Sequence, residues 1–272
     1  MMDWLHYLLL AILQGIAEIL PISSSGHLAL YQAIFNINQG YEGTFSILLH
    51  GGSLLALLVY FSPSIVRLLQ SVFFFIQGKR SSAILEDMQF IGYLLLASLP
   101  AGIVGVFLSD TIDAIFASLT FVGIGFLITA GLLYLVYRKS KQSQTKTYSL
   151  ISALGAGFAQ VLGIFPGISR SGSTISGALL TGLSLSKAKE FSFFMFIPIS
   201  AGSFLLSLDR LQSVETIDWM PMLVAVAVTF GVTLITLHLV LKRLKVTHFP
   251  YFSMYLVLIG IITLILAGLP QG

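Results

Sequence analysis

QGIAEILPISSSGH, residues 14–27, places a carboxylate, a proline and three consecutive serines inside an apolar region that carries no other charge between residues 4 and 37. Stranding the Glu18 carboxylate in hydrocarbon would cost roughly 2.5 to 3.5 kcal/mol, so an ionisable group at this depth needs a polar partner. A second stretch, FPGISRSGSTISG at 165–177, places the opposite charge, Arg170, in an equally apolar region. We therefore predict that the two stretches form one buried site for an anion, shared by Glu18 and Arg170.

The composition identifies the solvent of this chain. Of its 272 residues, 56% are hydrophobic and only 9% are charged, and the mean hydropathy is +0.95. A soluble globular protein has about a quarter of its residues charged, so we predict a protein of the membrane bilayer. The net charge of +3 does not indicate a nucleic-acid partner, because the basic residues fall between apolar spans. The absence of cysteine leaves only oxygen ligands or histidine for any metal.

Apolar stretches of about 20 residues are long enough to cross a bilayer as helices. Six qualify, at 43–62, 88–109, 116–137, 191–208, 219–241 and 249–269. Two further apolar regions, 4–37 and 148–186, are broken in the middle by Pro, Gly and Ser, which predicts re-entrant hairpins whose tips line a cavity. The predicted fold is thus an all-α polytopic membrane protein with six transmembrane helices, two re-entrant helix-loop-helix hairpins and an inverted-topology repeat.

The distribution of charge predicts the topology. Twelve of the fourteen basic residues lie in segments that would share one side of the membrane, which the positive-inside rule makes cytoplasmic. These residues are Arg67, Lys79, Arg80, Arg138, Lys139, Lys141, Lys146, Lys187, Lys189, Lys242, Arg243 and Lys245. The acidic residues expected on the outer side are Asp3, Glu42, Asp110, Asp113, Asp209, Glu215 and Asp218. Both termini are then outside, and the two hairpins enter from opposite sides, so that their tips can meet within the membrane.

An internal repeat supports this arrangement. An offset of 146 residues aligns identical residues in both halves, namely Gln14 with Gln160, Ile22 with Ile168, Ser23 with Ser169, Ser25 with Ser171, Gly26 with Gly172, Phe45 with Phe191 and Ser46 with Ser192. Each half has one hairpin and three spans, and this odd number of crossings inverts the second copy. We predict a single domain, 1–272, built from repeats 1–140 and 141–272. The copies differ at the reactive positions, where Glu18, Ser24 and His27 face Ile164, Arg170 and Ser173.

The polar residues of the two tips suit a phosphate or a diphosphate. Each tip is a Ser/Gly turn that opens a helix, and such a turn offers N–H and hydroxyl donors to an anion beside the Arg170 fork. The candidate substrate-binding residues are Ser23, Ser25, Gly26, Ser169, Ser171, Gly172, Ser173 and Thr174. Gln14 and Glu18 lie four residues apart on one helical face and could hold Mg²⁺ or Ca²⁺. Ser24 and His27 are the nearest candidates for nucleophile and proton carrier, and their spacing does not decide which attacks.

Other polar and aromatic residues have simpler interpretations. His50 follows an apolar run, and we expect it to be a hydrogen-bonded helix-packing residue. The phenylalanines of FSFFMF, residues 191–196, are expected to contact the core or the lipid. The small-residue stretch AGIVG, residues 101–105, could pack against another helix and leaves a homodimer open.

Both motifs resemble those of a known family, the membrane undecaprenyl-diphosphate phosphatases linked to bacitracin resistance. Residues 14–27 look like its (E/Q)xxxE and serine-rich motif, residues 166–177 look like its PGxSRSGxT motif, and the resemblance covers essentially the whole chain. It implies that Glu18 is the essential acid and is linked to the metal, that Ser24 and His27 are the nucleophile or the acid–base pair, and that Arg170 clamps the phosphate. Many relatives have Glu at the position of Gln14, which leaves the metal stoichiometry open.

Two functions remain in competition. The resemblance implies an integral membrane hydrolase that converts undecaprenyl diphosphate to undecaprenyl phosphate and inorganic phosphate at the extracytoplasmic face of the bacterial plasma membrane. Such an enzyme recycles the lipid carrier for peptidoglycan synthesis and confers bacitracin resistance. The alternative is a lipid or small-anion transporter or flippase, because inverted repeats with broken hairpins also build secondary transporters. The difference between the repeats favours the hydrolase, since transport needs only binding groups.

Overall fold

The computed structural model describes residues 4–37, 39–108, 118–139, 145, 147–206 and 219–269. Within these residues the regular structure is helical apart from an isolated bridge between Thr145 and Leu183, which confirms the all-α class. The elements are α1 (Trp4–Ala17), α2 (Ser24–Ile34), α3 (Gln39–Tyr60), α4 (Ser62–Ile76), α5 (Ser82–Phe107), α7 (Leu119–Lys139), α8 (Leu150–Leu162), α9 (Arg170–Leu180), α10 (Leu185–Leu206), α12 (Trp219–Arg243), η1 (Val246–His248) and α13 (Phe249–Gly268). Except for Glu42, the acidic residues expected on the outer side lie outside the described residues.

The described helices include enough apolar length for a multi-pass membrane protein. Four segments, namely α5, α7, α12 and η1 with α13, are long and apolar enough to cross a bilayer, and α3 with α4 forms a fifth candidate that is bent by 70°. They coincide with five of the six predicted spans. The remaining prediction, 191–208, falls on α10, which is not among the spans that meet this test and carries Lys187, Lys189 and Glu190 in its first two turns. The count of six spans therefore stays a prediction.

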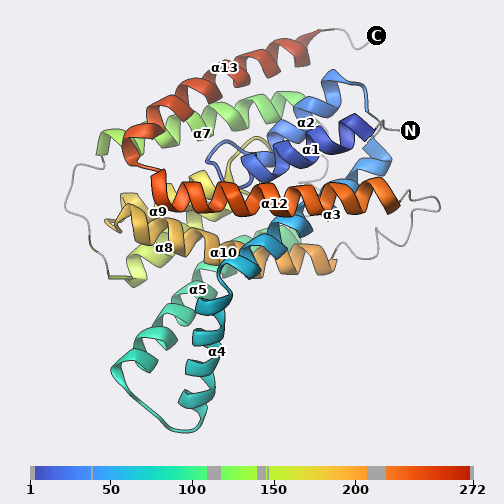
Figure 1. The fold of residues 1–272 in the computed structure, drawn as a ribbon. Helices are drawn as coiled ribbons and strands as arrows, with labels where there is room; N and C mark the ends of the chain where they lie inside the picture. Colours follow the sequence, from blue (N-terminus) through green and yellow to red (C-terminus); the bar gives the residue numbers. More distant parts are fainter. Residues whose placement is uncertain are drawn as a thin grey trace.

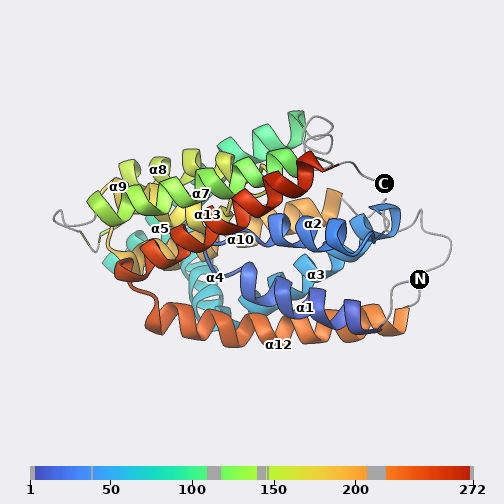
Figure 2. The same cartoon turned by 90° about the horizontal axis from the view of Figure 1, so that it is seen from above.

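Of the long helices, α7, α12 and α13 run in similar directions (Figures 1 and 2). α7 packs against α13, α12 packs against α1 and α3, and α5 packs against α8 and α10. α1 begins and α13 ends at the same end of the molecule, which fits the prediction that both termini share one side (Figures 1 and 2). The hairpin of α4 with the first part of α5 extends away from the other helices (Figure 1).

The helix bounds repeat at the offset found in the sequence. α9 and α10 begin and end 146 residues after α2 and α3, and α8 begins 146 residues after α1. The packing partners are matched as well, because α1 and α3 contact α12 whereas α8 and α10 contact α5. These correspondences support two equivalent halves. The opposite orientation of the halves in the membrane and the boundary at residue 140 stay predictions.

Both predicted hairpins are present as a helix, an irregular tip and a second helix. In the first hairpin, Pro21 lacks the N–H that a continuing helix requires, and Ser23 adopts a left-handed φ of 70°, a conformation that is costly for a residue with a Cβ. The Ser23 side chain then caps α2 by accepting a hydrogen bond from the Gly26 N–H at 3.2 Å. In the second hairpin, Gly167 takes the left-handed φ of 79° and Ser169 caps α9 through the Gly172 N–H at 3.0 Å. The two tips are therefore held by equivalent caps.

The second tip is seated directly on α7. A Cβ added to Gly167 would lie 2.1 Å from the Val122 carbonyl oxygen, and a Cβ added to Gly125 would lie 2.2 Å from the Pro166 carbonyl oxygen. In addition, the Thr129 hydroxyl lies 3.0 Å from the Ser169 N–H, from which it accepts a hydrogen bond. Backbone contact at this distance is possible only without side chains, so these glycines fix the depth of the tip against α7.

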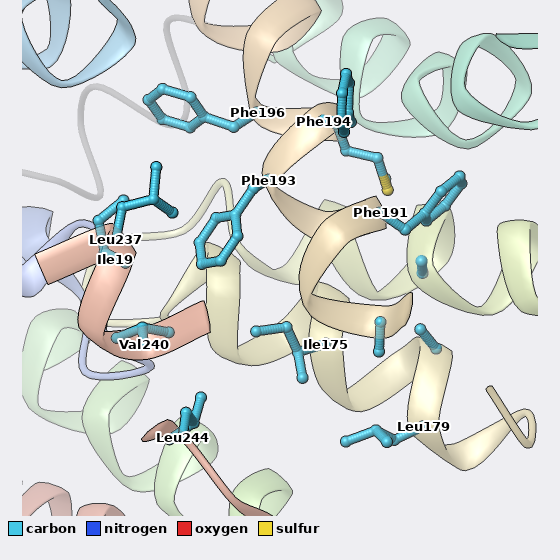
Figure 3. Packing of buried hydrophobic residues seen from close by; sticks show 14 of the residues in the cluster. Ile19, Ile175, Leu179, Phe191, Phe193, Phe194, Phe196, Leu237, Val240 and Leu244 are labelled. Atoms are coloured by element: carbon cyan, nitrogen blue, oxygen red, sulfur yellow. The ribbon is translucent and has the colours of Figure 1, made fainter. Parts of the chain in front are cut away.

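The hydrophobic core surrounds α10 (Figure 3). The phenylalanines of α10 between residues 191 and 196 are almost fully buried, which confirms the predicted core contact. Figure 3 shows Phe193 and Phe196 on the side of Ile19, whereas Phe191 and Phe194 lie on the opposite side of the helix. The side that faces Ile19 is therefore directed towards the first tip, which Ile19 belongs to.

α10 is fixed to α12 by a buried lysine. Lys189, counted above among the cytoplasmic charges, is only 5% exposed. Its Nζ donates to the carbonyl oxygens of Val240, Leu241 and Leu244 at 3.1, 2.7 and 3.3 Å. A cation at this position caps the carboxyl end of α12, where a helix runs out of its own N–H donors and its dipole is negative.

Candidate active site

The two hairpin tips meet, as the sequence predicts. Arg170 at the start of α9 forms an ion pair with Glu18 in the first tip. Beside it, the Ser171 hydroxyl donates to the Leu20 carbonyl oxygen at 3.1 Å. The carboxylate and the guanidinium thus share one site although 152 residues separate them in the chain.

Glu18 is buried and both of its oxygens are engaged. Oε1 accepts from Arg170. Oε2 accepts from Gln14 Nε2 at 2.7 Å and from the Ser24 hydroxyl at 2.7 Å, and His50 Nε2 lies 3.4 Å away. Arg170 on one oxygen, and Gln14 and Ser24 on the other, replace the water that the carboxylate loses on burial. Glu18 is therefore the centre of the polar cluster.

Arg170 is held from a second direction by an aromatic ring. Its guanidinium carbon lies 3.7 Å from the centroid of the Phe196 ring, and Nη1 lies 3.5 Å from the Ser200 hydroxyl. The side chain is 18% exposed, so the cation–π contact is largely shielded from water. Both Phe196 and Ser200 belong to α10. The sequence reading assigned this run of phenylalanines to the core, and it missed the contact because helical periodicity does not reveal which ring faces the arginine.

The tip serines divide into caps and other roles. Ser23 and Ser169 cap their helices, and each lies near the serine two residues later, at 3.4 Å from Ser25 and 3.3 Å from Ser171. Gly26 and Gly172 already donate their N–H groups to these caps, so an anion would have to compete for them. Of the remaining predicted binding residues, Thr174 donates to the Arg170 carbonyl oxygen at 2.9 Å, whereas the buried Ser173 hydroxyl has no hydrogen-bond partner within the described part of the chain.

Ser24 is the half-buried hydroxyl in contact with the carboxylate. Its hydrogen bond to Glu18 Oε2 joins a hydroxyl to a carboxylate at 2.7 Å, within the distance that proton transfer between them would require. The group that contacts the Ser24 hydroxyl is thus Glu18, whereas the sequence suggested His27 as its proton carrier.

His27 lies in the first turn of α2 but is engaged elsewhere. Its Nδ1 lies 2.7 Å from the Ser23 carbonyl oxygen, which can only accept, so Nδ1 carries a hydrogen. Its Nε2 lies 2.6 Å from the Tyr255 hydroxyl, and the two rings are stacked with centroids 5.6 Å apart. In a neutral imidazole Tyr255 is therefore the donor. Tyr255, on α13, has no sequence signal that could have identified it.

His50 is hydrogen-bonded, as the sequence predicts, but it also faces the Glu18 carboxylate, which the sequence did not predict. It lies on α3, and besides its contact with Glu18 its Nδ1 lies 2.8 Å from the Ser46 carbonyl oxygen. The side chain is 34% exposed, so the ring is only partly enclosed by the protein. A histidine in the middle of a predicted span was the available signal, because polar groups at that depth commonly face a functional site.

Comparison with known proteins identifies the family. The model of the bacitracin resistance protein BacA family matches residues 7–262. The chain belongs to this family. Undecaprenyl-diphosphatase 2 of Bacillus thuringiensis (strain Al Hakam) is 36% identical over 264 residues, which cover 96% of this chain and 97% of that protein. The undecaprenyl-diphosphatase of Oceanobacillus iheyensis is 35% identical over 266 residues, covering 96% and 95%. That of Methanosphaera stadtmanae is 36% identical over 280 residues, covering 98% and 99%. The chain is thus similar to these proteins over nearly its full length.

Gln14 and Glu18 are the residues of this BacA-family chain that were predicted to hold a divalent cation. Among the described residues, no group of three or more His, Asp or Glu side chains is arranged to hold a metal ion. However, Gln14 is fully buried, and none of the residues that the structure describes donates a hydrogen bond to its Oε1. A hard cation binds amide and carboxylate oxygens, so the pair fits an ion that takes its other ligands from water and from substrate oxygens.

Proposed function

We propose that this protein is a membrane diphosphatase that hydrolyses undecaprenyl diphosphate to undecaprenyl phosphate and inorganic phosphate. One observation carries the proposal, namely that a serine hydroxyl, a carboxylate and an arginine converge where the two hairpin tips meet. A transport site needs only binding groups, whereas a hydroxyl bonded to a buried carboxylate supplies a nucleophile and its base. The names of the relatives agree with this chemistry.

The ion pair between Glu18 and Arg170 provides the resting state of the site. A terminal phosphate carries more negative charge than the carboxylate and offers three oxygens, so it can compete for the guanidinium fork. Arg170 would then turn from Glu18 to the phosphate while the Phe196 ring keeps it in place. This exchange frees Glu18 to act as a base.

The reaction follows from the contact between Ser24 and Glu18. Ser24 Oγ forms a bond to the terminal phosphorus while its proton passes to Glu18, and the bond from that phosphorus to the bridging oxygen breaks, which releases the lipid monophosphate. Water then attacks the phosphoserine, Ser24 Oγ leaves with a proton from Glu18, and Glu18 takes a proton from the water and passes it to solvent. Arg170 stabilises the charge on the transferred phosphoryl group in both steps. A divalent cation held by Gln14 and Glu18 would supply further neutralisation of the diphosphate.

Phosphate release from undecaprenyl diphosphate by the purified protein, in detergent with Mg²⁺ or Ca²⁺, tests the proposal. Glu18→Gln and Arg170→Ala should each lower kcat by about 10² or more, as removal of a group that stabilises developing charge does. Glu190→Gln is a matched control, because this carboxylate contacts Lys187 and Tyr148 instead of the tips. No release by the wild type, or full rates in both site variants, would overturn the proposal. Phosphoserine at position 24 should accumulate during turnover, and its absence would leave direct attack by water.

The expected location is the plasma membrane, with the site open to the extracytoplasmic face. The distribution of basic residues supports this orientation. Since the chain contains no cysteine, single cysteines can report it without background labelling. In intact cells, an impermeant thiol reagent should label Asn36→Cys, at the outer end of the first hairpin, and should spare Gln77→Cys after α4. The reverse pattern would contradict the orientation. A homodimer stays a prediction, which the mass of the detergent-solubilised protein tests.

A further inference from the structure

His27 is a buried histidine that the proposed reaction leaves unused. It is 6% exposed, and its ring contacts the ring of Phe126 edge to face and the ring of Tyr255 by stacking, with centroids 5.0 and 5.6 Å away. Both ring nitrogens are occupied, because Nδ1 donates to the Ser23 carbonyl oxygen at 2.7 Å and Nε2 accepts from the Tyr255 hydroxyl at 2.6 Å. A histidine held in this way has neither a lone pair nor an N–H left for the substrate or for Ser24.

The carbonyl that accepts from His27 belongs to the strained part of the first tip. Ser23 has a left-handed φ of 70°, and a residue with a Cβ keeps such a conformation only where its surroundings hold it. Its carbonyl oxygen accepts from His27 twice, from the side-chain Nδ1 and from the backbone N–H at 3.2 Å. The peptide that carries this oxygen leads directly into Ser24. The two hydrogen bonds therefore fix the plane of the peptide from which Ser24 and α2 begin.

The orientation of Ser24 matters because its hydroxyl lies 2.7 Å from Glu18 Oε2. A displacement of a reacting group by about 1 Å can lower a rate by about 10²-fold. The outermost member of the chain of contacts, Tyr255, belongs to α13 and not to the hairpin. α13 is in turn fixed to α7, where the Ser253 hydroxyl donates to the Ala130 carbonyl oxygen at 2.8 Å. The tip is thus held from a helix pair outside it.

We propose that Tyr255 is a positioning residue for the reaction, which acts through His27 on the Ser23 carbonyl and so orients the Ser24 hydroxyl towards Glu18. In this arrangement His27 donates a fixed hydrogen bond to the backbone and carries no proton to or from the substrate. The inference rests on the proposed diphosphatase function, since the group that is oriented is the proposed nucleophile.

The variants His27→Asn and His27→Leu form a matched pair for kinetic measurements of phosphate release. Their side chains branch alike, but only asparagine offers an N–H close to the place of Nδ1. His27→Leu should lower kcat by about 10²-fold, with KM close to that of the wild type. His27→Asn should lose only about 2- to 10-fold, as Tyr255→Phe does, because both keep the hydrogen bond to Ser23 and lose the one to Tyr255. Adding Tyr255→Phe to His27→Asn should then cause no further loss.

The two kinetic comparisons can each overturn the proposal. Equal rates for His27→Asn and His27→Leu would show that the imidazole carries a proton. A further loss from Tyr255→Phe in the His27→Asn protein would show that Tyr255 does not act through His27. If His27→Leu does not fold, His27→Asn with and without Tyr255→Phe decides the question.

The tautomer of His27 provides a test that does not depend on turnover. In the full-length protein in detergent with ¹⁵N-labelled histidine, the nuclear magnetic resonance signals that disappear in His27→Asn belong to His27. They should show a hydrogen on Nδ1 and none on Nε2, and a hydrogen on Nε2 would refute the proposed contacts. A wild type that has this tautomer but releases no phosphate would instead refute the diphosphatase function.

Discussion

Replacing Phe196 with leucine should weaken the hold of the protein on phosphate through Arg170. The ring lies 3.7 Å from the guanidinium carbon, and the arginine side chain is 18% exposed. Cation–π contacts contribute about 0.5 to 1 kcal/mol at exposed sites and about 2 kcal/mol when they are shielded from water. At about 1.4 kcal/mol for each factor of ten, the upper value predicts a loss of roughly 30-fold in kcat/KM. The inhibition constant of inorganic phosphate should rise in parallel.

Phe194→Leu provides the matched control. Phe194 lies two residues earlier on α10 and is as buried as Phe196, but it packs against Phe61 and Phe90 with ring centroids at 4.8 and 5.3 Å. Both substitutions remove the same volume from the core, so both should lower the thermal stability by a similar amount.

The assay is phosphate release at varied undecaprenyl diphosphate concentrations for both leucine variants and for Phe196→Tyr. Only Phe196→Leu should lose kcat/KM, and Phe196→Tyr, which keeps an aromatic face, should recover most of it. Equal losses in the two leucine variants would show that Phe196 acts through packing alone, and the positioning of Arg170 by the ring would be refuted.

Two further changes test the elements around the site. Tyr255→Phe removes the hydroxyl that donates to His27 Nε2, and the loss of about 0.5 to 1.5 kcal/mol should lower kcat by about 2- to 10-fold with little change in KM. Tyr251→Phe, one turn earlier, is the control and should have no effect. Equal rates for the two variants would show that Tyr255 is not part of the site. Gly125→Ala should sharply lower the thermal stability and the activity, because its Cβ would lie 2.2 Å from the Pro166 carbonyl oxygen. Gly131→Ala on the same helix is the control, since its Cβ meets open space, and it should be neutral. A melting temperature for Gly125→Ala equal to that of the control would contradict the close packing of the second tip on α7.

The sequence was sufficient for the features that depend on local chemistry. A charge at membrane depth, a proline and a serine-rich turn predicted both hairpins, and the offset of 146 residues anticipated the bounds of α8, α9 and α10. Because a buried carboxylate needs a cationic partner, the sequence alone predicted that Glu18 pairs with Arg170. The span predicted at 191–208 falls on α10, which carries charged residues in its first two turns and is not among the helices apolar enough to cross a bilayer.

The tertiary structure alone decided which side chains complete the site. Tyr255 reaches His27 across 228 residues, and Phe196 and His50 reach Arg170 and Glu18 from helices whose rotation is set by packing. Apolar periodicity fixes that a helix is buried, but it does not fix which neighbour each side chain meets, since that depends on the relative rotation and depth of several helices at once. The reactive residues of the two tips can therefore be identified from the sequence, whereas the contacts that orient their side chains form only when the helices pack together.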